Sequence, residues 1–141
     1  METAAPSEDL RPTDSEVNLT FDELCAAAEL PEDRLRELEK FGLLAGRPVA
    51  GAVYYDDEAF EVARLAAGFL RFGVEARHLR IYKNAAEREA GFFEQVVMPL
   101  MRQRNPGARR QAVDTLTELA KLGQGLRSAM LRQALKDYTA T

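Results

Sequence analysis

Hydrophobic residues in the first half of the chain recur every three or four positions, which is the period of an amphipathic α-helix. The first such stretch, 21–28, follows Thr20, and Glu23 stands where a capping box needs its second partner. A second stretch, 31–41, begins with proline and is followed by glycine, residues that are favoured at a helix start and end. The sequence therefore predicts two short helices joined by a tight turn.

A different pattern occupies 43–55, where two glycines and a proline interrupt short apolar pieces. Because such punctuation is typical of hairpins, we expect the pieces 43–44 and 53–55 to form a small β-hairpin. A third helix, over 57–72, is predicted after Asp56, which can cap it. Its apolar positions, expected in the core, are Phe60, Val62, Ala63, Leu65, Ala66, Phe69 and Leu70.

Two long helices are predicted in the second half, one from about residue 76 and one from 108 to about 137, with a turn at 105–107. Pro99 is expected to kink the first of them. The last helix carries a narrow apolar seam that suits packing along another helix, either of this chain or of a second copy. The residues of this candidate dimer seam are Leu116, Leu119, Gly123, Leu126 and Met130.

Charge separates the two ends of the 141-residue chain. Residues 1–41 carry twelve acidic and four basic side chains, a balance of −8, whereas 77–136 carry twelve basic and five acidic, a balance of +7. Residues 1–18 are acidic and poor in apolar groups, so we expect a disordered tail or linker there. The remaining chain is predicted to divide into a helical domain over 19–75 and a helical hairpin over 76–141.

The composition argues against an enzyme or a metal protein. One histidine and one cysteine cannot build a zinc site of ordinary spacing, no glycine-rich phosphate loop follows a strand, and no serine has a placed base. We therefore assign no catalytic residue, no metal ligand and no cofactor, and interpret Cys25 as packing. Neither a signal peptide nor a membrane span is recognisable, so we expect a soluble, cytoplasmic protein without membrane contacts.

In its order of helix, turn, helix, hairpin and helix, the stretch 19–80 resembles the winged helix-turn-helix of MerR-type regulators. The motifs that carry this resemblance are Thr20-Phe21-Asp22-Glu23-Leu24, Leu35-Arg36 with Glu39, Gly42-Leu43-Leu44, Gly51 with Tyr55-Asp56-Asp57-Glu58, and Phe72-Gly73-Val74. The resemblance implies a mainly all-α fold: a degenerate MerR-type winged helix with a small hairpin wing, followed by two long C-terminal helices that form an antiparallel hairpin.

The departures from the MerR pattern fall where that family contacts DNA. Acidic or apolar residues replace the family's arginines, tyrosines and turn glycine at Asp33, Glu37-Leu38, Val53 and Glu29. The expected recognition helix, 32–40, carries four acidic and three basic side chains, a poor match for DNA phosphates. We therefore expect that the chain keeps the fold of the family but has lost the residues with which the family binds DNA.

The second half resembles the C-terminal region of actinobacterial MerR regulators of the FtsR kind. The residues that carry this likeness are Arg77-His78-Leu79-Arg80, the run 85–90, Val97-Met98-Pro99-Leu100 and Arg102-Gln103-Arg104-Asn105-Pro106. The resemblance implies a dimerisation and effector-sensing domain of a transcription regulator, a homodimer, and DNA held by a separate N-terminal domain. The chain is then either a C-terminal fragment or a free-standing paralogue.

A small-molecule or protein effector would need a site, and basic and aromatic residues after position 75 are the candidates. This candidate effector or anion pocket comprises Arg77, His78, Arg80, Tyr82, Arg88 and Phe92. In the structural alternative, the arginines pair with nearby carboxylates such as Glu75 or Glu87, and His78 packs on the hairpin.

Two other functions remain open. The chain itself could bind DNA through Arg34, Arg36 and Arg47, a possibility that a positively charged second helix would favour. Alternatively, the acidic first half is a docking surface for RNA polymerase or another regulator, in which Asp33 and Glu37 would contact the partner.

Overall fold

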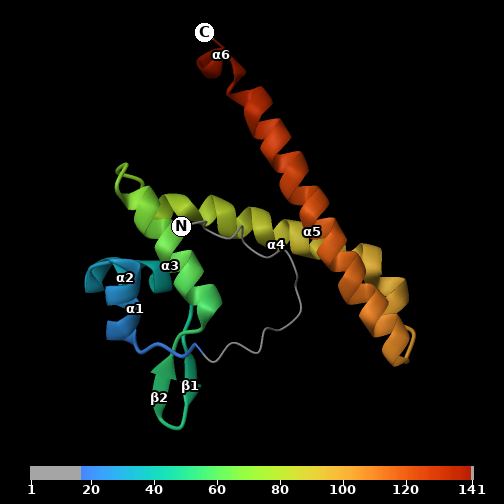
Figure 1. The fold of residues 1–141 in the computed structure, drawn as a ribbon, viewed down its shortest axis with the longest axis horizontal. Coiled ribbons are helices and arrows are strands. Elements are labelled where there is room, and N and C mark those ends of the chain that lie inside the picture. Colours follow the sequence, from blue (N-terminus) through green and yellow to red (C-terminus); the bar gives the residue numbers. More distant parts are fainter. Residues whose placement is uncertain (1–16, 141) are drawn as a thin grey trace, which may run out of the picture. The chain divides into compact units, whose positions relative to one another are not determined.

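A computed structural model describes residues 17–140 as a mainly helical chain with one two-stranded sheet (Figure 1). In chain order the elements are α1 (Phe21–Ala28), α2 (Glu32–Lys40), β1 (Arg47–Val49), β2 (Ala52–Tyr54), α3 (Asp57–Leu70), the 3₁₀ helix η1 (Ala76–Leu79), α4 (Arg80–Met101), α5 (Pro106–Ala134) and α6 (Lys136–Thr139). The predicted fold class, mainly helical with a hairpin wing and a long C-terminal helix pair, is confirmed. The predicted disordered tail, 1–18, lies outside the described residues except for its last two positions.

Two helix starts are formed by the residues expected to cap them. The N–H of Glu23 donates to Thr20 Oγ1 at 3.2 Å, and the N–H of Thr20 donates to Glu23 Oε1 at 3.0 Å. The bond from the Thr20 N–H stabilises the carboxylate and so lowers the pKa of Glu23. Asp56 Oδ1 accepts a hydrogen bond from the N–H of Ala59 at 2.9 Å and caps α3. Both capping predictions are confirmed.

The hairpin forms, but the prediction of its first strand at 43–44 is wrong. The strand is β1, which pairs antiparallel with β2 so that Pro48 lies opposite Val53. Leu44 is instead buried in the core, because Gly42, with φ 74°, ends α2 and turns the chain directly inward. Tyr55, predicted in the second strand, forms an isolated bridge with Leu19 just beyond β2.

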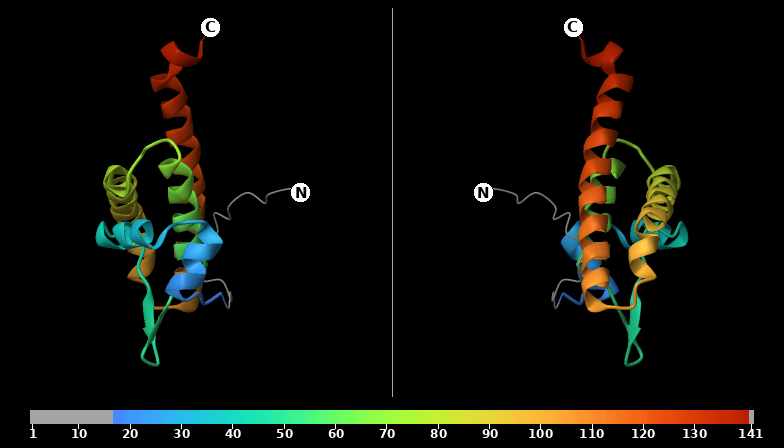
Figure 2. Two further views of the ribbon diagram at one scale, coloured as in Figure 1. Left: turned by 90° about the vertical axis from the view of Figure 1, so that its left-hand side faces the viewer. Right: turned by 90° about the vertical axis from the view of Figure 1, so that its right-hand side faces the viewer.

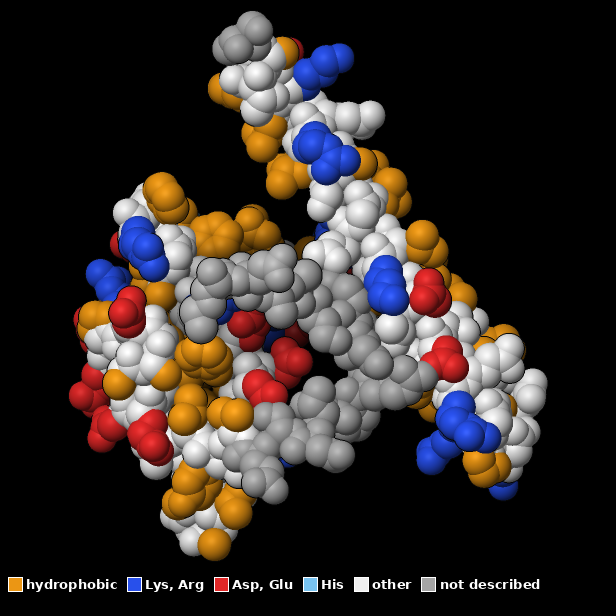
Figure 3. Space-filling model, in the orientation of Figure 1, with side chains coloured by type: hydrophobic (Ala, Val, Ile, Leu, Met, Phe, Trp, Pro, Cys, Tyr) orange, Lys and Arg blue, Asp and Glu red, His pale blue; other side chains and the backbone are white. Residues whose placement is uncertain are grey.

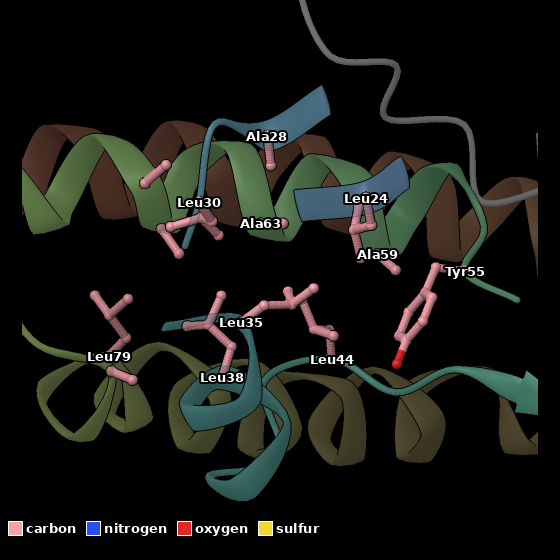
Figure 4. Packing of buried hydrophobic residues seen from close by; sticks show 13 residues of the cluster. Leu24, Ala28, Leu30, Leu35, Leu38, Leu44, Tyr55, Ala59, Ala63 and Leu79 are labelled. Atoms are coloured by element: carbon pink, nitrogen blue, oxygen red, sulfur yellow. The ribbon is translucent and has the colours of Figure 1, made fainter. Parts of the chain in front are cut away.

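Contacts divide the described chain into two compact units whose boundary falls within α4, after residue 88. The N-terminal unit, 17–88, has a core of leucines packed against alanines (Figure 4). In that view Leu24 and Ala28 of α1 and Ala59 and Ala63 of α3 face Leu35 and Leu38 of α2, together with Leu44 and Leu79. Leu24, Leu35 and Leu38 expose no surface. Because alanines line α3, the helices can approach closely, and this core fixes the geometry of the whole unit.

Helix α3 departs from its prediction in length and in its buried face. It ends at Leu70 rather than at 72, and Gly73 follows with φ 78°. Leu65 and Phe69, both expected in the core, are 50% and 36% exposed. The buried positions of α3 are its alanines, since the small side chains face α1 and the larger apolar residues flank that contact. Periodicity alone therefore overestimates the width of the buried stripe.

The C-terminal unit, 89–140, is built from the second part of α4 and from α5, which pack together through Val97, Ala108 and Ala112. Helix α5 begins two residues before its predicted start, because Asn105 Oδ1 accepts a hydrogen bond from the N–H of Ala108 at 2.8 Å. Pro99 lies in the last turn of α4, which ends at Met101. Figure 2 shows α5 as one unbroken helix.

Across residues 17–140, no helix combines the length and the apolar character needed to cross a membrane.

Candidate functional site

The three arginines considered for DNA binding each contact a carboxylate of their own unit. Arg36 Nη2 lies 2.6 Å from Glu32 Oε1, Arg34 Nη1 lies 3.4 Å from Glu37 Oε2, and Arg47 Nη2 lies 3.6 Å from Asp56 Oδ2. Arg36 also stacks over the Phe21 ring at 4.8 Å. Figure 3 shows acidic side chains gathered over α1 and α2. This surface offers little positive potential to a DNA phosphate.

Two residues of the predicted effector pocket are engaged by Glu75 at the start of η1. Arg77 Nε lies 2.9 Å from Glu75 Oε2, and the backbone N–H of Glu75 donates to His78 Nδ1 at 3.0 Å. The Glu75 carboxylate in turn accepts a hydrogen bond from the N–H of His78. These contacts match the local pairing considered for Arg77, whereas His78 completes a cap instead of packing on the hairpin.

The other predicted pocket residues lie along α4. The Arg80 guanidinium is 6.0 Å from the centre of the Phe41 ring, and the Tyr82 ring is 5.5 Å from that of Phe69. Arg88 is exposed at the end of the N-terminal unit, and Phe92 is 61% exposed in the C-terminal unit. Their joint role as an effector site stays a prediction.

A pocket that the sequence did not reveal opens in the N-terminal unit, between the α1–α2 turn and the end of α3. Its volume is about 360 Å³, and its lining includes Leu30, Leu70, Val74, Glu29, Arg34 and Arg71. None of the six residues predicted for the effector pocket lines it. Three separate stretches, 29–34, 67–71 and 73–75, supply the lining, so no single periodic pattern could indicate it. The sequence signal for this pocket was a pair of helix-breaking residues, Pro31 and Gly73.

The candidate dimer seam on α5 differs in exposure along its length. Leu116, Leu119 and Gly123 are half-buried, whereas Leu126 and Met130 are 62% and 59% exposed. Glu89 of α4 forms an ion pair with Arg127, and its carboxylate lies against Gly123, so this part of α5 packs on its own unit. Beyond Arg127, every residue of α5 except Ala129 is exposed.

The exposed part of the seam gains a residue that the sequence reasoning missed. Leu122 is 68% exposed and lies four residues before Leu126, which itself lies four before Met130. We call these three residues the distal face. Figure 3 shows hydrophobic side chains on the surface of α5 over much of its length. The regular spacing along the helix was the signal that could have found Leu122.

The chemically reactive groups of the described chain are few and structural. Burial raises the pKa of the Cys25 thiol, and the neighbouring carboxylates of Asp22 and Glu32 raise it further, so the thiol is a poor nucleophile at neutral pH. Within 17–140, no three His, Cys, Asp or Glu side chains gather as a metal ion would require.

Comparison with known proteins connects the chain to transcription. Residues 17–139 match the family described as Rv1828-like, C-terminal domain. The chain is similar to two mycobacterial HTH-type transcriptional regulators, Rv1828 of Mycobacterium tuberculosis and Mb1859 of Mycobacterium bovis. Each is 29% identical over 121 residues, an alignment that covers 86% of this chain and 48% of the relative. The chain thus spans about half the length of the curated relatives it matches.

Proposed function

Because the chain belongs to the Rv1828-like C-terminal domain family and is related to HTH-type transcriptional regulators, we propose that it is the regulatory part of a MerR-type regulator. In this role it carries out no reaction, and it pairs with a second copy through α5. DNA is bound by a separate N-terminal domain outside this chain. That division of labour agrees with the neutralised arginines of α2 and with relatives about twice as long.

The exposure of the distal face is the observation that carries the proposed pairing. Its three side chains are between 59% and 68% exposed, and they form a continuous stripe on a helix of 29 residues. A helix interior that also contains Gly123 and Gly125 loses about 1 kcal/mol of intrinsic stability for each glycine. A second copy that covers the stripe would offset this loss by burying apolar surface.

A heptad frame gives the stripe a self-complementary register. With Leu119 and Leu126 at position a and Leu122 and Ala129 at position d, an antiparallel pair sets Leu122 of each copy opposite Leu126 of the other. Leu119 then faces Ala129. Because the same contacts occur twice about a two-fold axis, the interface closes on itself and gives a dimer instead of a fibre.

The same register pairs opposite charges at the flank of the stripe. Glu118 of one copy lies opposite Arg132 of the other, and this pair also occurs twice. Gly125 is at the same flanking position, g, as Glu118 and Arg132, and it pairs with Gly125 of the other copy beside the two-fold axis. In the chain alone, no atom lies within 4 Å of the place where a Cβ of Gly125 would be. This open site favours a close approach of the second backbone.

A two-fold dimer suits the proposed regulatory role. Regulators that read operators with two half-sites hold two DNA-binding domains at a fixed spacing, and a paired C-terminal arm sets that spacing. The orientation of the two DNA-binding domains then depends on this dimer. An effector that changes the conformation of the dimer would change the spacing of the DNA-binding domains.

Charge reversal across the proposed interface tests this function. Glu118→Arg and Arg132→Glu each create two like-charge contacts, and we expect each to weaken dimerisation about tenfold. The double variant E118R/R132E restores opposite charges and should recover the affinity of the unmodified chain. Analytical ultracentrifugation of the three variants measures the dissociation constants.

The matched control is Glu94→Arg, which makes the same charge change at an exposed position of α4 away from the stripe. It should leave dimerisation unaltered. Single variants that pair as well as the unmodified chain would refute the register, and so would a double variant that stays as weak as the singles.

A further inference from the structure

Apolar side chains form part of the wall of the pocket in the N-terminal unit. Leu30 is only 6% exposed, and Leu70 and Val74 are half-buried where they line it. Its volume of about 360 Å³ is within the size range of sites that hold small organic molecules. At Gly73, which also lines the pocket, no atom lies within 4 Å of a Cβ position. The interior can therefore receive an apolar group of modest size.

Two arginines at this pocket have hydrogen-bond donors to offer. Arg71 is exposed and forms no ion pair with any residue of the described chain, although it lines the pocket. Arg34 shares one contact of 3.4 Å with Glu37, and both side chains are 42% exposed. A guanidinium carries five N–H donors, so each arginine retains most of its capacity to bind a carboxylate.

The two carboxylates that line the pocket differ in whether their charge is already paired. Glu75 is engaged by the Nε of Arg77 and by the backbone N–H of His78, which satisfy its negative charge locally. Glu29 is exposed, has the left-handed conformation that ends α1, and opposes an anion. The two glutamates and two arginines of the lining balance in number, so any preference for an anion depends on Arg71, which is unpaired near the end of α3.

We propose that this pocket binds a small carboxylate with an apolar body. The body packs between Leu30, Leu70 and Val74, and the carboxylate accepts hydrogen bonds from the guanidinium of Arg71 and the spare donors of Arg34. Apolar contacts supply affinity and the two arginines supply the selection for charge. The effector role of such a ligand rests on the proposed function, but its binding to the N-terminal unit does not.

A pair of probes that differ only in charge tests the proposal. The chain is titrated with 2-naphthoate and with its neutral counterpart 2-naphthamide while backbone amide signals are followed by NMR. We expect 2-naphthoate to give saturable shifts at Leu30, Gly73 and Val74, and to bind about tenfold more tightly than the amide.

Three variants locate the charge selection. Arg71→Gln should weaken the binding of 2-naphthoate about tenfold and leave the binding of 2-naphthamide unchanged. Glu29→Gln should strengthen the binding of 2-naphthoate about threefold, because it removes a repulsive charge. The control is Arg64→Gln, on the same helix, whose guanidinium bonds Glu61 at 2.6 Å and does not line the pocket. This change should leave both probes unaffected.

Equal affinity for the two probes would overturn the proposal, as would an Arg71→Gln chain that still prefers the anion or an absence of saturable shifts at millimolar probe. Failure of the proposed pairing is seen separately. A Leu126→Glu chain that cannot dimerise should bind 2-naphthoate as the unmodified chain does, because the pocket lies wholly in residues 29–75.

Discussion

Tyr55 connects parts of the N-terminal unit through both its backbone and its side chain. It is 3% exposed, its backbone bridges Leu19, and its hydroxyl donates a hydrogen bond to Glu39 Oε1 at 2.7 Å. Burial raises its pKa to about 12, and the bond to the Glu39 carboxylate adds to the rise. The neutral phenol is therefore part of the folded state.

Replacing Tyr55 by phenylalanine should lower the free energy of unfolding by about 1 kcal/mol at pH 8, because Glu39 loses its donor. The difference should shrink between pH 10 and 12. In that range the unfolded chain releases the tyrosine proton while the folded chain retains it, so the unmodified protein loses stability that the variant never had. Urea unfolding at several pH values measures both effects, and a pH-independent difference would contradict this account.

Residue-scale features were predictable where the partners are close in sequence. Thr20 and Glu23 are three positions apart and so reveal a capping box directly. Tyr55 and Glu39 are sixteen positions apart, and no periodic pattern records their bond. The pocket between α1–α2 and α3 was missed for the same reason, because its lining depends on how three segments pack.

At the scale of elements, the hairpin turn contains a strained residue. Ala50 and Gly51 connect β1 and β2, and both have positive φ, 50° and 84°. Two such residues between antiparallel strands form a type I′ turn, which favours Asn followed by Gly. Alanine at the first position therefore carries a conformational cost that the sequence alone does not reveal.

Ala50→Asn should raise the free energy of unfolding by about 0.5 kcal/mol, because asparagine adopts positive φ more readily than alanine. Ala45→Asn, at an exposed loop position before β1, is the control and should change stability little. Thermal unfolding followed by circular dichroism compares the two. A destabilised Ala50→Asn chain would argue against this turn conformation.

The two glycines of α5 should respond differently to alanine. Gly125 has open space around its Cβ position, so Gly125→Ala should stabilise the helix by about 1 kcal/mol. At Gly123 a Cβ would meet the carboxylate of Glu89 and disturb its ion pair with Arg127, so Gly123→Ala should gain little or lose stability. Both are measured in a Leu126→Glu background, where pairing does not contribute. Equal gains for both would show that α4 does not constrain Gly123.

At the element scale the sequence predicted where helices lie better than which face they bury. Caps at Thr20 and Asp56 fixed two helix starts, whereas Asn105 moved the start of α5 earlier than expected. Leu65 and Phe69 of α3 are four residues apart, as Ala59 and Ala63 are, but they lie on another side of the helix and remain exposed. Whether a residue is buried depends on which neighbouring helix covers it. The sequence of a single helix does not carry this information.

At the scale of the whole molecule, two compact units meet within one helix and present different surfaces. The N-terminal unit has an acidic α2 and a small pocket, and the C-terminal unit has a long helix with an uncovered apolar stripe. The chain belongs to the Rv1828-like C-terminal domain family, and the proposed regulatory role assigns DNA binding to a separate domain. The proposed function depends on the pairing of two copies through α5.

The molar mass of the chain in solution shows whether two copies pair. Light scattering at micromolar concentration should give twice the 15.7 kDa of one chain for the unmodified protein and for Leu131→Glu. Leu131 is 60% exposed, as exposed as Leu126, but points away from the distal face. Leu126→Glu should give the mass of one chain, because it places a charge within the apolar stripe. A monomeric unmodified chain, or a dimer that tolerates Leu126→Glu, would contradict pairing through α5.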